Sequence, residues 1–156
     1  MRDPAIIIDR MSNPAFIIRG VDYGTHREAL RAIRRRVFIE EQGVPEALEW
    51  DEIDPECEHV LAFAFDGAAV ATARLLPNGH IGRMAVLAPW RGRGIGSAML
   101  NHLVQRARER GFEAARLHAQ THAVGFYARQ GFEAIGEEFL EAGIPHYAMV
   151  RKLKPG

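Results

Sequence analysis

HIGRMAVLAPWRGRGIGSAMLNHLVQRARER, from His80 to Arg110, is the stretch that decides the fold. Its first part, Ile81 to Leu87, is a short and mostly apolar run that is typical of a buried strand. From Ile95 onward, apolar residues recur at the three- and four-residue spacing of a helix, with charged residues between them. A strand therefore passes into a helix across the glycine-rich turn from Arg91 to Gly96.

This turn has the properties of an anion-binding site. The first N–H groups of a helix have no partner within the helix, and the positive end of the helix dipole points in the same direction. Two familiar glycine loops are excluded by spacing. The dinucleotide fingerprint would need glycine at Ser97 or Met99, and the P-loop would need a Gly-Lys-Ser/Thr sequence that does not follow. An ordinary strand-to-helix turn is the alternative interpretation.

The composition indicates one globular domain in a reducing compartment. The chain has 156 residues, of which 47% are hydrophobic, and a formal net charge of +0. A chain with this charge balance has no net positive charge to attract nucleic acid or an anionic membrane surface, and we expect neither as a partner. Cys57 is the single cysteine, so an internal disulfide is impossible. The sequence has neither a signal-peptide pattern nor an apolar run near the ~18 residues of a membrane span, so we predict a cytoplasmic protein.

Residues 1–14 are predicted to be an N-terminal extension, and residues 15–156 to form the domain. The AIIID run near the start is too short for a signal or a membrane span, and Met11 follows it. We therefore interpret residues 1–10 as an optional extension or a disputed start. The domain is expected to begin with a strand from Ala15 to Val21.

A helix is predicted to follow from Thr25, which forms a capping box with Glu28. The apolar residues of this segment share one helical face: Leu30, Ile33, Val37 and Phe38. The basic residues lie opposite or beside them: Arg27, Arg31, Arg34, Arg35 and Arg36. We interpret the basic face as solvent-exposed, with phosphate contact as the alternative.

The segment from Glu40 to Glu58 is strongly acidic and has no lysine or arginine. Pro45 and Pro55 interrupt it, so we expect a long loop with one short helical turn. An acidic loop beside a cofactor site would attract a cationic amine. The alternative is a loop that only improves solubility.

The remaining strands are marked by turns. Asp66-Gly67 predicts a hairpin between His59–Phe65 and Ala69–Leu76, and Pro77-Asn78-Gly79 leads into the central strand. The long helix is expected to end at Gly111.

After the long helix, the chain is expected to return as a strand and end in a hairpin. Ala114–Gln120 is predicted to be a strand parallel to the central one, across a right-handed crossover. Thr121 would then cap a short helix that ends at Gly131. The last two predicted strands, Phe132–Phe139 and Pro145–Leu153, pair around Glu141-Ala142-Gly143.

Two motifs in this order resemble the GNAT superfamily of acetyl-CoA-dependent N-acetyltransferases. They are Arg91-x-x-Gly94-x-Gly96 and Ala123-x-x-x-Tyr127-x-x-x-Gly131-Phe132. The phrases VFIEEQGVPEALEWDEIDPE, LHAQTHAVGFYARQGF and EAGIPHYAM are similar to the ElaA-like branch of small bacterial members. The resemblance covers about Ala15 to Leu153 and implies an α/β (α+β) single-domain GNAT (acyl-CoA N-acyltransferase) fold, with a mixed, splayed β-sheet flanked by helices.

The resemblance implies direct transfer of the acetyl group of acetyl-CoA to a primary amine of a small molecule or peptide. Residues of the central strand would bind the pantetheine arm and the thioester oxygen: Met84, Ala85 and Val86. One N–H aimed at the oxyanion is worth about 3 kcal/mol. Residues of the turn would bind the pyrophosphate: Arg91, Gly92, Arg93, Gly94, Ile95 and Gly96. The second motif contributes Ala123 and Tyr127 to cofactor binding.

Gln120 departs from the family pattern, which often has Asn three residues before the position of Ala123. The glutamine amide has the same hydrogen-bonding groups on a longer arm, so its cofactor contact is open. A non-catalytic acyl-CoA-binding or sensing module of the same fold is the alternative function, in either case as a monomer or homodimer.

Tyr127 occupies the family position of the acid that protonates the leaving thiolate; a core aromatic is the alternative. His80 is the first candidate for the general base, because it lies four residues before Met84 and strand alternation would place both on one face. The alternative is a histidine that is only exposed at the start of a strand. Glu41, Asp51 and His146 are rival bases, and we expect these three to line the amine site.

The other histidines and the cysteine receive structural interpretations. His118 and His122 lie on either side of a strand-to-helix change, so they lack the shared helical face of a zinc pair, and no metal site is predicted. Cys57 and His59 could form a nucleophile pair, but nothing else in the sequence supports that chemistry.

Overall fold

The computed structural model describes residues 6–10 and 13–153. In this part of the chain, the strands form two antiparallel sheets. The larger sheet has the order β1 (Ile6–Arg10), β2 (Asn13–Val21), β3 (Glu58–Ala64), β4 (Ala69–Leu75), β5 (Ile81–Val86). The smaller sheet has the order β6 (Ala114–Gln120), β8 (Ile144–Lys152), β7 (Glu133–Glu141).

The helices connect these strands. The longer ones are α1 (Tyr23–Arg34), which continues as the π-helical segment η1 (Arg35–Glu41), and α3 (Ile95–Glu109). The short ones are α2 (Glu46–Glu49), α4 (Val124–Arg129) and the 3-10 turns η2 (Asp54–Glu56), η3 (Ala88–Trp90) and η4 (Thr121–Ala123). Among the described residues, no helix has both the length and the apolar character that crossing a membrane requires.

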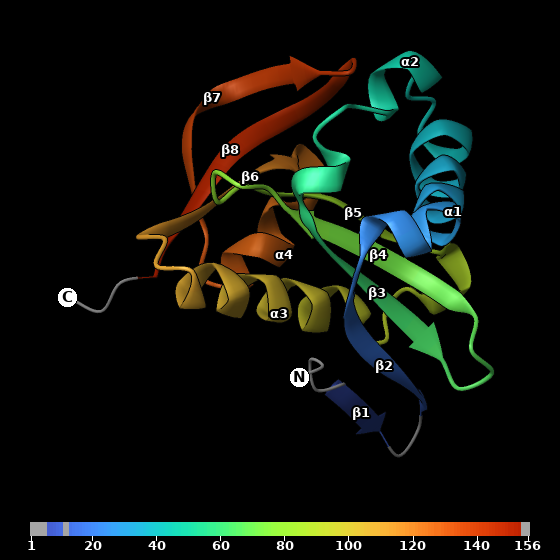
Figure 1. Cartoon of the computed structure of the whole chain (residues 1–156). Helices are drawn as coiled ribbons and strands as arrows, with labels where there is room; N and C mark the ends of the chain where they lie inside the picture. The colour runs from blue at the N-terminus through green and yellow to red at the C-terminus, as the bar shows by residue number, and fades with distance from the viewer. Residues whose placement is uncertain (1–5, 11–12, 154–156) are drawn as a thin grey trace.

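Helices α1 and α3 cover opposite faces of the larger sheet (Figure 1). Alternate residues of a strand point to opposite faces, and β3 shows this directly. Val60 and Ala62 belong to the core cluster that includes α3, whereas Leu61 packs with Leu30 and Ile33 of α1. Two hydrophobic layers therefore hold the sheet between the helices.

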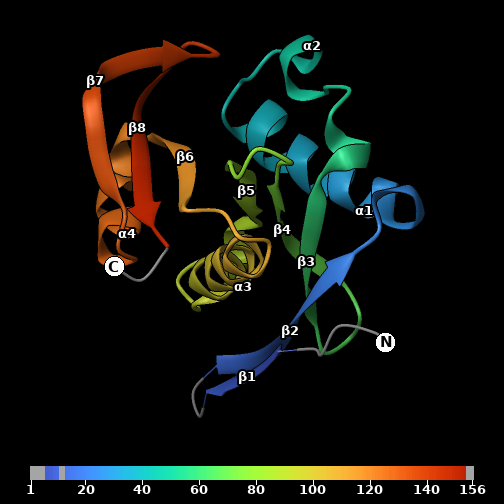
Figure 2. The same cartoon turned by 60° about the vertical axis from the view of Figure 1, so that its left-hand side comes forward.

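The two sheets diverge between β5 and β6, as Figure 2 shows. One parallel bridge, His80 to Arg116, joins them at the start of these strands. The predicted splayed sheet is confirmed. The predicted parallel pairing of β6 is limited to this bridge, because β6 forms its ladder with β8 instead.

Helix α1 begins two residues before the predicted start. Asp22 is its N-cap, because the Asp22 side chain accepts a hydrogen bond from the Thr25 N–H at 2.9 Å. The predicted capping box of Thr25 and Glu28 is therefore wrong. The predicted apolar face is confirmed by the burial of its four residues: Leu30, Ile33, Val37 and Phe38.

The predicted exposure of the basic face is wrong at Arg34, which is 1% exposed. The acidic segment folds back over α1, so that the Arg34 guanidinium contacts Glu49 and Asp54. The acidic segment itself is broken into α2 and η2, as its prolines indicated.

At the N-terminus, β1 pairs with β2, so part of the predicted extension adds a strand to the sheet. Residues 1–5 and 11–12 of that extension, and residues 154–156 of the predicted domain, lie outside the described residues. Gly111 follows α3 with a φ of 84°, as predicted for its C-terminal glycine. Thr121 does not cap α4, because its hydroxyl donates to Glu138 instead.

Candidate active site

A bulge interrupts β5 at the centre of the molecule. Thr72 pairs with Ala85 and Arg74 with Gly82, so Arg83 and Met84 together face one residue of β4. Arg83 has a φ of 50°, in the left-handed region. Beyond the bulge, the Leu87 N–H donates to Val70, and by antiparallel alternation the N–H and C=O of Val86 point away from β4.

The bulge changes the reasoning about His80. Simple alternation predicts that His80 and Met84 share a face, but the extra residue breaks that alternation. Both side chains nevertheless line the same hollow, described below.

The glycine turn presents an accessible backbone. Gly92 and Gly94 have φ values of 77° and 86°, which favour glycine, and Gly94 is the N-cap of α3. A Cβ atom added to either would meet nothing within 4 Å. Open space therefore lies beside the start of α3, where the first N–H groups of a helix have no partner within the helix, as anion binding requires.

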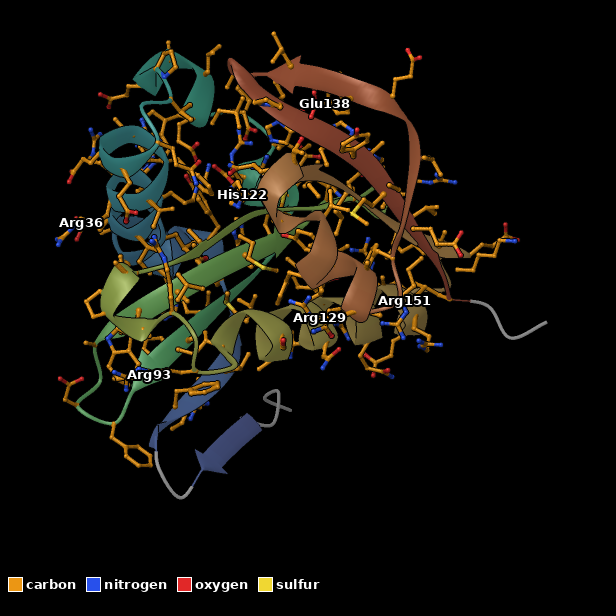
Figure 3. All side chains as sticks on the ribbon, turned by 180° about the vertical axis from the view of Figure 1, so that it is seen from behind. Arg36, Arg93, His122, Arg129, Glu138 and Arg151 are labelled. Carbon is orange, nitrogen blue, oxygen red and sulfur yellow. The ribbon has the colours of Figure 1, made fainter. Side chains whose placement is uncertain are left out.

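Most of the predicted cofactor residues come together around one hollow of about 480 Å³. Its lining includes Met84, Ala85, Val86, Arg91, Gly92, Gly94, Ile95, Gly96, Ala123 and Tyr127. Arg93 is not in this lining, and its guanidinium lies 4.8 Å from the ring centroid of Trp90. Figure 3 shows Arg93 at the edge of the molecule, far from His122.

A second hollow, of about 540 Å³, lies on the other side of Met84 and Tyr127. It opens between the acidic segment and the β7–β8 hairpin, with Leu48 and Glu49 on one wall and Glu141 and Ile144 on the other. Both hollows share the lining residues Gln42, Met84, His122, Ala123 and Tyr127. We call the first the cofactor hollow and the second the acceptor hollow, after the roles that the sequence analysis predicts for residues in their linings.

The comparison with protein families shows the family of this chain. The family model described as "Acetyltransferase (GNAT) domain" matches residues 22–153. The chain belongs to the GNAT acetyltransferase family.

Relatives and solved structures match most of the chain. The Bacillus subtilis protein YyaT is 40% identical over 132 residues, which are 81% of this chain and 88% of YyaT. An acyl-CoA N-acyltransferase from Pseudomonas aeruginosa is 31% identical, with a TM-score of 0.77, and the match covers 87% of this chain and 99% of that one. Escherichia coli ElaA is 27% identical, with a TM-score of 0.78 and coverage of 88% and 99%. The predicted GNAT fold and the resemblance to ElaA are confirmed.

In this GNAT domain, Tyr127 lies where the two hollows meet. Its hydroxyl contacts the Met84 sulfur at 3.7 Å, and its ring packs edge-on against Phe126 and Phe132. Burial disfavours the phenolate and raises the pKa of Tyr127 to about 12. The phenol therefore keeps its proton at neutral pH.

Four histidines line the acceptor hollow: His80, His118, His122 and His146. His80 lies at 3.1 Å from the Asn78 amide oxygen, and burial, with smaller effects of His118 and Arg116, lowers the pKa of His80. His122 contacts the Gln120 oxygen at 2.8 Å. Figure 3 places His122 between helix α1 and the β7–β8 hairpin.

Sequence reasoning assigned no site role to His118 or His122. Alternation along β6 could have found His118, because His118 and Gln120 are two residues apart and share a face of the strand. Gln120 itself lines the acceptor hollow, not the cofactor hollow. Its amide nitrogen donates to the Gln42 oxygen at 2.8 Å, across the gap between β6 and η1.

The three residues expected at the amine site, Glu41, Asp51 and His146, lie in different parts of the structure. His146 lines the acceptor hollow. Glu41 lies on the cofactor side, where both of its oxygens are 2.9 Å from Arg91, whose Nε also donates to the Val86 oxygen. Asp51 lines neither hollow, and the hydrogen bond from Arg74 lowers the pKa of its carboxyl.

Arginines neutralise most of the acidic segment. The carboxylates with arginine partners are Glu41, Glu46, Glu49, Asp51, Asp54 and Glu58. The most buried of these, Glu49 and Asp54, are 3% and 1% exposed. This segment is therefore a structural wall of the acceptor hollow, and little of its charge is free to attract an amine.

The described residues contain no group of three or more metal-ligating side chains. Burial raises the pKa of Cys57 to about 11, and its thiol donates to the Ile53 carbonyl. His59 contacts the Asp54 carbonyl at 2.8 Å. These contacts support a structural interpretation of Cys57 and His59.

Proposed function

We propose that this GNAT protein transfers the acetyl group of acetyl-CoA directly to a primary amine of a small molecule or peptide. The observation that supports this most strongly is the meeting of the two hollows at Met84 and Tyr127. A thioester held from one side and an amine held from the other would meet at these residues, with no carrier group between them.

The residues of the cofactor hollow fit a CoA thioester. The turn offers backbone N–H groups at the start of α3 with open space in front of Gly92 and Gly94, as a pyrophosphate requires. The Val86 N–H points away from β4 and suits the thioester oxygen. When bound, acetyl-CoA supplies an activated acetyl group and a thiolate leaving group.

Tyr127 is proposed to protonate that thiolate. Its phenol is fixed by Phe126 and Phe132 and keeps its proton near neutral pH, so it can act as the acid when the C–S bond breaks. The proposed base is a histidine of the acceptor hollow. His80 is one candidate, and the next subsection argues for another.

Calorimetry with CoA and thiol release from acetyl-CoA, measured across monoamines, polyamines, amino sugars and peptides, test the proposal. We expect CoA binding and thiol release that depends on at least one amine. CoA binding without amine-dependent release would favour a sensing module. A cytoplasmic location and a monomeric or homodimeric state stay predictions.

A further inference from the structure

Two hydrogen-bond acceptors face one another in the acceptor hollow. The His146 Nε2 and the Glu141 Oε2 are 3.8 Å apart, which exceeds hydrogen-bond distance. His146 is on β8 and 6% exposed, and Glu141 is at the end of β7. Both residues line the hollow opposite the acidic segment.

The contacts of His146 determine which nitrogen can act as a base. Its Nδ1 is 2.6 Å from the Ile144 carbonyl oxygen. Because a carbonyl oxygen only accepts hydrogen bonds, Nδ1 must hold a proton. In the neutral imidazole, Nε2 then has a free lone pair, as a general base requires, and His146 lines the hollow.

Among the described residues, Glu141 is oriented by histidines and forms no ion pair with an arginine. Its Oε1 is 2.8 Å from the His118 Nδ1, which orients the carboxylate. Its Oε2 faces His146. Glu49, the other carboxylate in the lining of this hollow, is bound by Arg34 and Arg83. Glu141 therefore provides the carboxylate of the hollow that has no arginine partner among the described residues.

We propose that Glu141 Oε2 and His146 Nε2 together bind the ammonium group of the acceptor, and that His146 removes its proton. This inference rests on the proposed function. An ammonium group has three N–H donors, so it can donate to both atoms at once and fill the space between two acceptors. His118 is a positioning residue that acts through Glu141.

The proton balance follows from these contacts. One ammonium proton passes to His146 Nε2, which leaves a neutral amine and an imidazolium beside Glu141. The amine nitrogen forms the bond to the thioester carbon, and the C–S bond then breaks. Tyr127 gives its proton to the sulfur and recovers one from the second N–H of the adduct. The proton on His146 is released to solvent, so the products are the amide, the free thiol and one proton.

The same contacts narrow the class of acceptor. Glu141, a carboxylate without an arginine partner among the described residues, can pair with one ammonium group. The further ammonium groups of a polyamine would lie against the acidic segment, whose carboxylates are mostly paired with arginines. Apolar side chains form much of the remaining lining, and Leu48 is 57% exposed at its acidic-segment wall. The favoured acceptor is a monoamine with an apolar substituent, not a polyamine.

The test compares thiol release from acetyl-CoA with 2-phenylethylamine and with spermidine. We expect 2-phenylethylamine to have the higher kcat/KM. Glu141→Gln, which keeps the side-chain shape, should raise the KM for 2-phenylethylamine at least ~10-fold, and His146→Ala should lower kcat by ~100-fold. Calorimetry should give unchanged CoA affinity for both variants. His26→Gln on α1, outside both hollows, is the matched control and should be unaffected.

Chemical rescue separates proton transfer from a structural role. Imidazole and its methylated derivatives should restore turnover of His146→Ala, more strongly as the base becomes more basic, and should not affect His26→Gln. Retained kcat in His146→Ala would overturn the proposal. So would a loss of kcat in His80→Gln with His146→Ala unaffected.

A second measurement does not depend on turnover. In nitrogen NMR spectra, the His146 Nε2 resonance of the wild-type protein should shift when 2-phenylethylamine is added, and this shift should be absent in Glu141→Gln. An unchanged resonance in the wild type would overturn the proposal even if the protein only senses acyl-CoA. CoA binding without thiol release, with the NMR shift present, would instead contradict the proposed function alone.

Discussion

The proposed protonation of the leaving thiolate depends on the hydroxyl group of Tyr127. Tyr127→Phe keeps the ring that packs against Phe126 and Phe132 but removes the proton. We expect kcat to fall by ~100-fold, with CoA affinity and thermal stability unchanged. Tyr147→Phe is a suitable control, because Tyr147 lines neither hollow. Full activity in Tyr127→Phe would return this residue to a core-packing role.

Asp51 is expected to affect stability more than acceptor binding. Arg74 lowers the pKa of its carboxyl, and a carboxylate with a lower pKa in the folded state stabilises the protein above its unfolded pKa of ~3.9. This contribution is lost as pH falls through the lowered folded value. The difference in unfolding free energy between wild type and Asp51→Asn should be constant from pH 7 to ~5 and should shrink below ~4.

Urea denaturation at several pH values measures the Asp51 effect, and KM values for acceptor and acetyl-CoA complete the test. Unchanged stability together with a selective rise in acceptor KM would restore Asp51 to the amine site. The sequence could not reveal its partner. Arg34 and Arg74 are buried because the acidic segment folds over them, and helical or strand periodicity contains no information about that long-range contact.

At the scale of elements, the turn between β5 and α3 was predictable and the bulge before it was not. Glycine spacing indicated a strand-to-helix turn with left-handed glycines, since backbone conformation at glycine and the start of a helix are local properties. The bulge places Arg83, a non-glycine residue, in the left-handed region, so the sequence has no glycine at this position that would predict the bulge. Contacts of Arg83 with Glu49 and Asp51 stabilise it instead.

Gly94→Asp tests the turn. The added carboxylate would stand where we expect the phosphates, so CoA affinity should fall more than tenfold in calorimetry, or by over ~1.4 kcal/mol. Gly67→Asp is a matched control, because Gly67 in the β3–β4 turn has a similar φ, 89° against 86°, and equal open space. The two variants should lose similar stability. Normal CoA binding by folded Gly94→Asp would show that the turn serves another purpose.

At the scale of the whole molecule, the fold was predictable because two motifs and the order of strands and helices are sequential features. The acceptor hollow was not, because its walls come from distant segments: η1, α2, the start of β5, β6, η4 and the β7–β8 hairpin. Of the three residues predicted at the amine site, His146 lines the acceptor hollow. Glu41 and Asp51 do not line it, because they form ion pairs with Arg91 and Arg74. Carboxylates that are close together in the sequence therefore lie at different places in the fold, because each forms an ion pair with a distant arginine.

The arrangement of both hollows around one tyrosine predicts direct transfer. The sole thiol, Cys57, lies in neither hollow and has a raised pKa, so it is not expected to hold an acetyl intermediate. Cys57→Ser should therefore leave kcat unchanged, as steady-state thiol release would show. A complete loss of turnover in a folded Cys57→Ser protein, together with an acetylated Cys57 in the wild type, would require a covalent route.

The most direct measurement is the initial rate of thiol release from acetyl-CoA, with acetyl-CoA and 2-phenylethylamine varied against each other. Both substrates must occupy their hollows together for direct transfer at Tyr127, so the double-reciprocal lines should intersect. Parallel lines would indicate an acetyl-enzyme intermediate and contradict direct transfer. The absence of amine-dependent release in a protein that binds CoA would contradict the transferase itself.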